Sequence, residues 1–274
     1  MANTRQLRRR IKSIKNTSQI TRAMEMVAAT KMRRAQNQAT SGRPYAETLM
    51  VSLSRLLPRI NPEAHPFLCG SESKEIGAVL LSTDKGLVGA LNTNLMRSVI
   101  SLTASFYTIG RKGRAFVVRT GKDLKADFEN VDTVTFRQSK QLAKMVIEAY
   151  LAKDLGEVYL VYPQFVSTLK QEPKKVKILP IELGEMPEAK EFLFEPNADT
   201  LLDFILVHHI EEQIYQALLE TKASEHSARM VAMKNATDNA KDLVDDLTLT
   251  YNQVRQDSIT RELLEITTAQ VAME

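Results

Sequence analysis

The chain has 274 residues, is 43% hydrophobic, and carries one cysteine and no tryptophan. This composition is typical of one or two globular domains with an apolar core, and it excludes a disordered chain and a disulfide-built fold. Because Cys69 has no Cys or His partner at ligand spacing, no structural zinc site is expected, and a reducing compartment is favoured. No apolar run approaches the roughly 18 residues of a membrane-spanning helix.

The formal net charge of +4 is very unevenly distributed along the chain. Residues 1–34 hold ten Lys or Arg and one acid, which gives a net charge of +9. Residues 197–274 hold fourteen acids and six bases, which gives −8 and leaves +3 for the residues between. The two ends are therefore electrostatic complements, which favours their pairing even though single surface ion pairs are weak.

The two ends are also free of helix-breaking residues. Neither Gly nor Pro occurs before Gly42, and the 78 residues after Pro196 contain none. A helix of that length would reach roughly 115 Å and would need a partner along its length. The N-terminal segment is the obvious partner, as a helix that continues beyond a kink near Gly42 and Pro44 to about Leu57. We expect an antiparallel pair, since the chain leaves one helix for a central region and returns into the other.

Apolar periodicity in the C-terminal segment predicts a coiled-coil seam. Its residues recur at three- and four-residue steps: Ala236, Ala240, Leu243, Leu247, Tyr251 and Val254. Beyond Arg255 the stripe moves to Ile259, Leu263 and Ile266, on a face turned by roughly 100°. We infer that the last ~20 residues extend past the N-terminal helix and turn their apolar side to another partner.

The N-terminal segment carries two apolar stripes on opposite sides, one of Leu7, Ile11 and Ile14 and one of Ile20, Met24 and Val27. A helix that is apolar nearly all round is enclosed by protein. Its basic charge allows three interpretations: a nucleic-acid-binding arm, a transit peptide, or a structural helix that faces an acidic protein. The stripes favour the third interpretation, because only that one demands packing.

The central region, about residues 70–190, alternates between strand and helix patterns. Strands are expected at Ile76–Thr83, before Gly110, at Glu157–Tyr162 and at Lys175–Ile181, and helices at Leu91–Thr103, after Lys112 and at Gln138–Leu155. This alternation predicts a mainly parallel sheet with crossover helices. The expected fold class is therefore mixed α+β and α/β: a long antiparallel two-helix coiled coil (residues 1–57 and 197–274) and a central Rossmann-like α/β domain (70–190).

No catalytic constellation is found in the sequence. The loop Asp84–Gly89 has a G-x-x-G spacing, which is neither the dinucleotide fingerprint nor a Walker loop, and Thr120–Asp123 is no closer. Adjacent His208 and His209 point to different faces of a helix, and neither His65 nor His226 has a ligand set around it. We expect no catalytic residue, no cofactor and no metal.

Three separated motifs nevertheless resemble one family. They are Ser224–Ala240 with Leu247–Gln256 and its continuation to Ile266, then Ile11–Thr17 with Ile20–Ala29, and the central Ser82–Ala90. Their order and sequence are similar to those of the γ subunit of bacterial-type F-type ATP synthase, and the likeness covers essentially the whole chain. The family usually has a Gly-containing run after the final Glu-Ile, whereas Thr267–Ala272 has no Gly, and Ser101–Gly110 is shorter than usual. The regulatory cysteine pair of the chloroplast form is absent.

The resemblance implies a rotor shaft that is not itself catalytic. In that family the terminal helices form a coiled coil inside a ring of three α and three β subunits. The α/β domain meets the ε subunit and the membrane c-ring. The implied function is to couple ion-driven c-ring rotation to ATP synthesis or hydrolysis, and to regulate ATPase activity and proton flow. The implied location is peripheral, on the cytoplasmic face of the inner membrane and held there through the c-ring, with no nucleic acid bound.

The motifs also carry over residue roles. Positions implicated in coupling or in contact with the α/β ring are Met24, Arg229, Arg255, Gln256, Thr260, Glu262 and Glu265. Positions nearer the foot that meets ε and the c-ring are Lys31, Arg33, Arg34, Phe194 and Glu195. Two other functions remain open from the residues alone: a coiled-coil nucleic-acid-binding protein with an added α/β domain, and a nucleotide-dependent enzyme that uses this domain.

Overall fold

The computed structural model describes residues 4–56, 65–71, 73–131, 133–182 and 198–271. By their contacts, residues 1–28 with 230–274 form one compact unit and residues 29–229 form a second. We call them the two-helix unit and the α/β unit. The expected division into 1–57, 70–190 and 197–274 follows secondary structure instead and stays a prediction. Residues 57, 183–190 and 197 at its borders lie outside the described residues.

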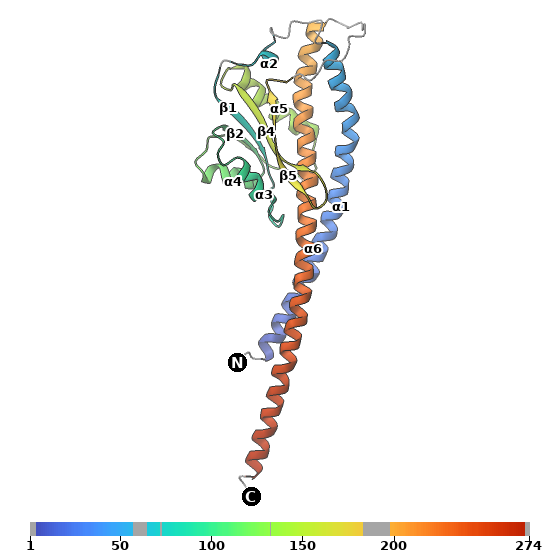
Figure 1. Ribbon diagram of the computed structural model, residues 1–274, viewed down its shortest axis with the longest axis vertical. Helices are drawn as coiled ribbons and strands as arrows, with labels where there is room; N and C mark the ends of the chain where they lie inside the picture. Colours follow the sequence, from blue (N-terminus) through green and yellow to red (C-terminus); the bar gives the residue numbers. More distant parts are fainter. Residues whose placement is uncertain (1–3, 57–64, 72, 132, 183–197, 272–274) are drawn as a thin grey trace. The chain divides into compact units, whose positions relative to one another are not determined.

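Two long helices contribute to both units. Helix α1 spans Thr4–Leu56 and helix α6 spans Ala198–Val271 (Figure 1). The long breaker-free segments therefore are helical, as expected. Helix α1 also continues through Gly42 and Pro44 as a single helix, although a proline inside a helix removes one backbone hydrogen bond.

The α/β unit contains a five-stranded sheet with the strand order β3-β2-β1-β4-β5 (Figure 1). Its strands are β1 (Ile76–Leu81), β2 (Ser105–Ile109), β3 (Leu124–Phe128), β4 (Glu157–Phe165) and β5 (Gln171–Leu179). The first four strands in that order are parallel, and β5 runs antiparallel to β4. The shorter helices are α2 (Pro66–Cys69), α3 (Leu91–Ser98), α4 (Arg111–Arg119) and α5 (Phe136–Leu151). This arrangement and the two long helices confirm the expected fold class.

Both faces of the sheet are buried, as parallel sheets require. Strand β1 shows this by alternation, because Ala78 and Leu80 belong to a core with α3 and α4. Val79 and Leu81 belong to the larger core, which includes residues of α5, α6 and the end of α1. The part of α6 that lies in this unit therefore serves as one of the layers over the sheet.

The sequence patterns missed two elements and misplaced the ends of several others, strands β1, β4 and β5 among them. Strand β3 lies at the sheet edge and is half-buried at alternate residues, with charged Lys125 and Asp127, so it has no continuous apolar run to mark it. The short helix α2 follows His65, whose ring accepts a hydrogen bond from the Phe67 amide. Helix α3 ends at Ser98 rather than Thr103, and α5 covers Phe136–Leu151 rather than Gln138–Leu155.

The turn between β2 and α4 depends on close backbone approach. Gly110 has a φ of +98°, and a Cβ there would lie 2.4 Å from the Ser82 carbonyl oxygen. The amide of Gly113 donates to Ser82 Oγ at 2.8 Å. These contacts hold the ends of β1 and β2 against the start of α4.

Replacing Gly110 by Ala is expected to destabilise the protein by at least about 2 kcal/mol more than replacing Gly121 by Ala. Both positions have positive φ, but a Cβ at Gly121 meets no atom within 4 Å. The control therefore carries the backbone strain alone, while Gly110→Ala adds a clash with backbone. Urea unfolding followed by circular dichroism measures the difference, and equal losses would show that the β2–α4 turn relaxes around the added methyl group.

Candidate functional site

The two-helix unit is held together by a narrow seam with a polar pair in it. Leu7, Thr21 and Ala28 of α1 are buried, as are Met233, Thr237 and Ala240 of α6. The hydroxyl oxygens of Thr21 and Thr237 lie 2.7 Å apart, which fixes the register of the two helices. The predicted seam residues on α6 are at least half-buried except Leu243, which is 45% exposed; Val244 takes its place. The expectation of Leu243 was wrong, because helical periodicity allows a step of either three residues (to Leu243) or four residues (to Val244) from Ala240.

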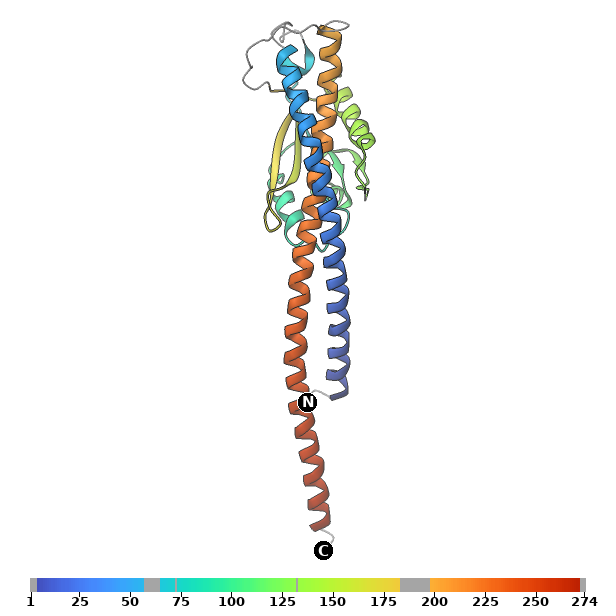
Figure 2. The ribbon, with the colours of Figure 1, turned by 90° about the vertical axis from the view of Figure 1, so that its right-hand side faces the viewer.

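The pairing stops well before α6 does. In an antiparallel pair, residues at equal distances along the chain from Thr21 and from Thr237, in opposite directions, lie opposite one another. Thr4, the first residue of α1, therefore lies opposite Val254 of α6. Every residue from Arg255 to Gln270 is exposed, and Figure 2 shows this end of α6 extending beyond the start of α1. The inference that the last residues of α6 extend past the N-terminal helix is confirmed.

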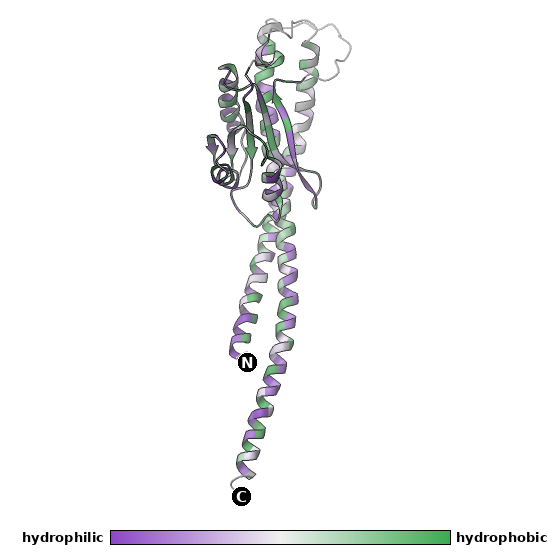
Figure 3. Ribbon diagram, turned by 60° about the vertical axis from the view of Figure 1, so that its left-hand side comes forward, coloured by the Kyte–Doolittle hydropathy of each residue, from purple (hydrophilic) through white to green (hydrophobic). Residues whose placement is uncertain are grey.

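This unpaired end is not a purely polar helix. Ile259, Leu263 and Ile266 are 49%, 59% and 62% exposed, and Figure 3 shows apolar residues interspersed with polar ones there. On α1, Ile20, Met24 and Val27 of the second predicted stripe are exposed too. Apolar patches that a chain leaves exposed mark surfaces for another protein, so we treat these two patches as the candidate interaction surface.

Most residues carried over for contact with the α/β ring lie on this surface. Arg255, Gln256, Thr260, Glu262 and Glu265 are all exposed on the unpaired part of α6. Thr260 Oγ1 donates to the Gln256 carbonyl oxygen at 2.9 Å, which leaves the Gln256 side chain uninvolved in that bond. Met24 is exposed on α1. Their roles stay predictions.

Arg229 differs from them because it is tied into the α/β unit. Its side chain is 14% exposed, and Nη2 donates to Glu225 Oε1 at 2.8 Å. The same nitrogen lies 3.4 Å from the Gly86 carbonyl oxygen. Lys222 Nζ lies 3.6 Å from the other Glu225 oxygen, and both of these side chains are 6% exposed. Arg229 therefore connects α6 to the loop after β1 through a buried charged cluster.

The foot residues are placed in three different ways. Lys31 and Arg34 line a cavity of the α/β unit, while Arg33 beside them is outside that lining; Arg33 and Arg34 are both exposed. Phe194 and Glu195 lie outside the described residues. The role of the foot residues in contact with other subunits stays a prediction.

The carboxyl edge of the sheet, where α/β folds bind ligands, is occupied by the protein's own groups. Asp84 Oδ1 accepts from the Arg111 amide at 2.9 Å at the start of α4, the place where a phosphate would sit. Ser82 Oγ, just after β1, accepts a hydrogen bond from the Gly113 amide and donates one to the Ile109 carbonyl oxygen. Asn130 donates to the Ser82 carbonyl oxygen. A helix N-terminus that is already capped by a carboxylate disfavours the nucleotide-enzyme interpretation.

Within the described ranges, no group of three or more His, Cys, Asp or Glu side chains is placed to bind a metal ion. None of the helices found there combines the length and the apolarity of a membrane span.

A protein-family model described as ATP synthase matches residues 3–273. The ATP synthase gamma chain of Methylacidiphilum infernorum (isolate V4) is 45% identical over all of both chains. That of Opitutus terrae is 43% identical over 99% of each. The chain belongs to the ATP synthase gamma-chain family. The resemblance found in the sequence motifs is thereby confirmed.

Solved structures agree with a gamma-chain fold. A chain of the Tetrahymena thermophila mitochondrial ATP synthase central stalk and c-ring is 26% identical, with a TM-score of 0.62 over 79% of this chain and 99% of that one. A chain of the Euglena gracilis mitochondrial ATP synthase is 22% identical, with a TM-score of 0.73 over 98% and 94%. The nucleic-acid-binding interpretation of the basic N-terminus finds no support among these relatives.

For this gamma-chain family member, sequence reasoning missed the buried charged cluster of α6. Lys222 and Glu225 were assigned no role, and His226 was considered only as a possible metal ligand. The available signal was the polar run from Thr221 to Ser227, which is buried throughout. Charged residues at helical spacing inside a breaker-free segment look like a solvated face until a second layer is known to cover them.

Two buried histidines predict a pH dependence of stability. Burial lowers the pKa of His209 to about 4, and the neighbouring His208 adds to the shift. Burial likewise lowers the pKa of His226 to about 4, although Glu225 opposes that shift. Since an unfolded histidine has a pKa near 6.5, the unfolded chain binds more protons between pH 6.5 and 4. The free energy of unfolding should therefore be highest above pH 6.5 and fall as the pH falls toward 4.

Replacing His209 by Gln should remove its share of that fall, which is about 2 kcal/mol between pH 7 and pH 5. Urea unfolding of both proteins at the two pH values measures it. An unchanged pH dependence in the variant would mean that His209 is reached by water.

Proposed function

We propose that this chain is the central-stalk rotor of an F-type ATP synthase, coupling ion-driven rotation of a c-ring to the catalytic β subunits. The observation that carries the proposal is the full-length match to ATP synthase gamma chains. It is supported by the unpaired end of α6, which exposes apolar residues that a partner would cover.

The proposed partners are a hexamer of three α and three β subunits, an ε subunit and a membrane c-ring. The two-helix unit would enter the hexamer, and the chain would sit peripherally at the cytoplasmic face of the inner membrane through the c-ring. The chain itself would hold no catalytic residue, in keeping with a sheet edge that its own Asp84 and Ser82 occupy. In the complex it would regulate ATP hydrolysis and proton flow.

The physical basis of coupling is asymmetry. A shaft whose sides differ offers different contacts to three otherwise identical β subunits, and differential contact free energy holds them in different conformations. Rotation then moves the three states around the ring. Basic residues of α1 would attract an acidic segment of β, an interaction that high salt weakens.

Individual roles follow the exposure of the side chains. Met24, Arg255, Gln256, Thr260, Glu262 and Glu265 are proposed to contact the ring, and each is exposed. Arg229 is proposed to act on coupling through the α6 cluster, since its guanidinium is bound to Glu225. Among the basic foot residues, Arg33 lies outside the cavity lining, whereas Lys31 and Arg34 belong to it.

Reconstitution tests the function. ATP hydrolysis by an α and β assembly is measured alone, with the full chain, and with a chain that ends at Val254. The full chain should enter the assembly and change its turnover, and the shortened chain should do so less effectively. A full chain that neither enters the assembly nor changes its turnover would refute the rotor proposal, and salt-sensitive DNA binding by that chain would restore the alternative.

A further inference from the structure

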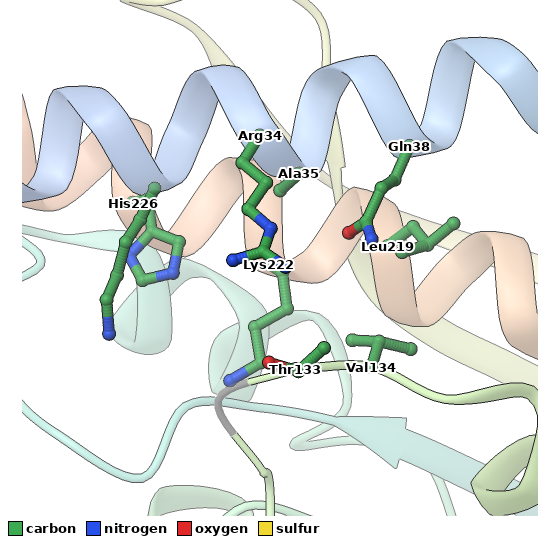
Figure 4. A pocket seen from close by; sticks show the side chains of 9 residues that line it. Arg34, Ala35, Gln38, Thr133, Val134, Leu219, Lys222 and His226 are labelled. Atoms are coloured by element: carbon green, nitrogen blue, oxygen red, sulfur yellow. The ribbon is translucent and has the colours of Figure 1, made fainter.

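The α/β unit contains a cavity of about 260 Å³ between α1, α6 and the segment before α5 (Figure 4). Arg34 reaches into it from α1, Lys222 and His226 from α6, and Thr133 lies across from them. One water molecule takes about 30 Å³ in the liquid. The cavity therefore has room for several water molecules or for a tetrahedral oxyanion with its hydration.

The charges that face this cavity are mostly positive. Lys31, Arg34 and Lys222 all line it, and none of the described lining residues is acidic. In the described part of the chain, Arg34 has neither a hydrogen bond nor an ion pair. A guanidinium carries five donors, so these remain available to a ligand.

Lys222 is compensated only in part. Its side chain is 6% exposed, and its Nζ lies 3.6 Å from Glu225 Oε2, which is longer than a hydrogen bond. Glu225 is shared, because its other oxygen binds Arg229 at 2.8 Å. A buried ammonium is costly unless charged or hydrogen-bonding partners surround it, so Lys222 retains donor capacity toward the cavity.

His226 adds a neutral donor beside the cations Arg34 and Lys222. Arg229 Nη1 lies 3.3 Å from His226 Nδ1, and because a guanidinium only donates, Nδ1 must accept. The neutral ring then carries its proton on Nε2. The pKa of about 4 keeps this ring neutral at pH 7.

We propose that this cavity binds a phosphate group, with Arg34 and Lys222 as its charged donors and Thr133 and His226 as neutral ones. Arg pairs with phosphate through two parallel hydrogen bonds, and Lys acts as a point charge. A doubly charged oxyanion would offset the charge of two of the three cationic side chains that line the cavity, which a chloride ion or water does not. The site lies within the α/β unit and does not depend on the proposed rotor function.

The full chain is tested with sodium phosphate as the probe, against sodium chloride at the same ionic strength. A ligand that binds only the folded state raises the unfolding temperature as its concentration rises. Phosphate should therefore raise the unfolding temperature of the wild type above that in chloride. Arg34→Gln should weaken the apparent phosphate affinity at least about tenfold, through the loss of a bidentate charge-assisted contact.

Arg33→Gln is the matched control, because it removes the same charge from the adjacent, exposed residue outside the cavity lining. It should keep wild-type phosphate affinity. An ADP arm separates free phosphate from a phosphoryl group carried by a nucleotide. Stronger binding of ADP with the same loss in Arg34→Gln would support the site and assign it to a nucleotide.

Two results would overturn the site. One is equal stabilisation of the wild type by phosphate and chloride. The other is phosphate binding that Arg34→Gln leaves unchanged or that Arg33→Gln weakens equally. Neither result bears on reconstitution with α and β subunits, so the site and the rotor function fail separately.

Discussion

Replacing Glu225 by Gln is expected to lower the free energy of unfolding by about 3 kcal/mol, although the two side chains have nearly the same shape. Glu225 is the acid shared by Lys222 and Arg229, at 3.6 Å and 2.8 Å. All three side chains are at most 14% exposed. Removing one partner of a buried ion pair leaves the other charge uncompensated, which typically costs about 3–5 kcal/mol.

The control is Asp238→Asn on the same helix. Asp238 pairs with Lys241 at 3.3 Å with the same i, i+3 spacing as Glu225 and Lys222, but both side chains are more than half exposed. Exposed pairs contribute about 0–1 kcal/mol because water screens them, so this variant should change stability by less than about 0.5 kcal/mol. Urea unfolding followed by circular dichroism measures both variants, and equal losses would mean that water solvates the α6 cluster.

The fold could be predicted largely because its signals are local. The absence of Gly and Pro marked α6 and the part of α1 before Gly42, and the apolar run at Ile76 marked β1. Strand β3 was not predicted, because an edge strand with Lys125 and Asp127 needs no apolar run. The exact end of α3 was not predicted. Val99 lies just beyond the helix but is buried, so its apolar side chain continues the helical pattern.

The candidate site, too, could be predicted only where its signal lies in one stretch of sequence. The shift of the apolar stripe at Arg255 predicted the unpaired end of α6 from helical periodicity alone. The cluster around Glu225 could not be predicted, because its burial depends on α1, on α6 and on the loop at Gly86, which are far apart in sequence. The seam choice between Leu243 and Val244 likewise depends on the register that Thr21 and Thr237 set.

Replacing Ile259, Leu263 and Ile266 together by Ser is expected to weaken binding to an α and β assembly at least about a hundredfold. The three side chains share one face of the unpaired end of α6 and are 49–62% exposed. If the hexamer encloses this end, each contributes up to about 1.5–3 kcal/mol of apolar burial to association. The free energy of unfolding of the isolated chain should change little, because these side chains bury little surface within it.

Leu169→Ser is the matched control, since Leu169 is 81% exposed on the turn between β4 and β5 of the α/β unit and is not one of the residues of the proposed interaction surface. It should bind the assembly like the wild type. Titration of each chain into the assembly, with ATP hydrolysis as the readout, gives the affinities. Wild-type affinity in the triple variant would mean that the end of α6 stays in water in the complex, and that the apolar residues of α1 carry the contact with the ring instead.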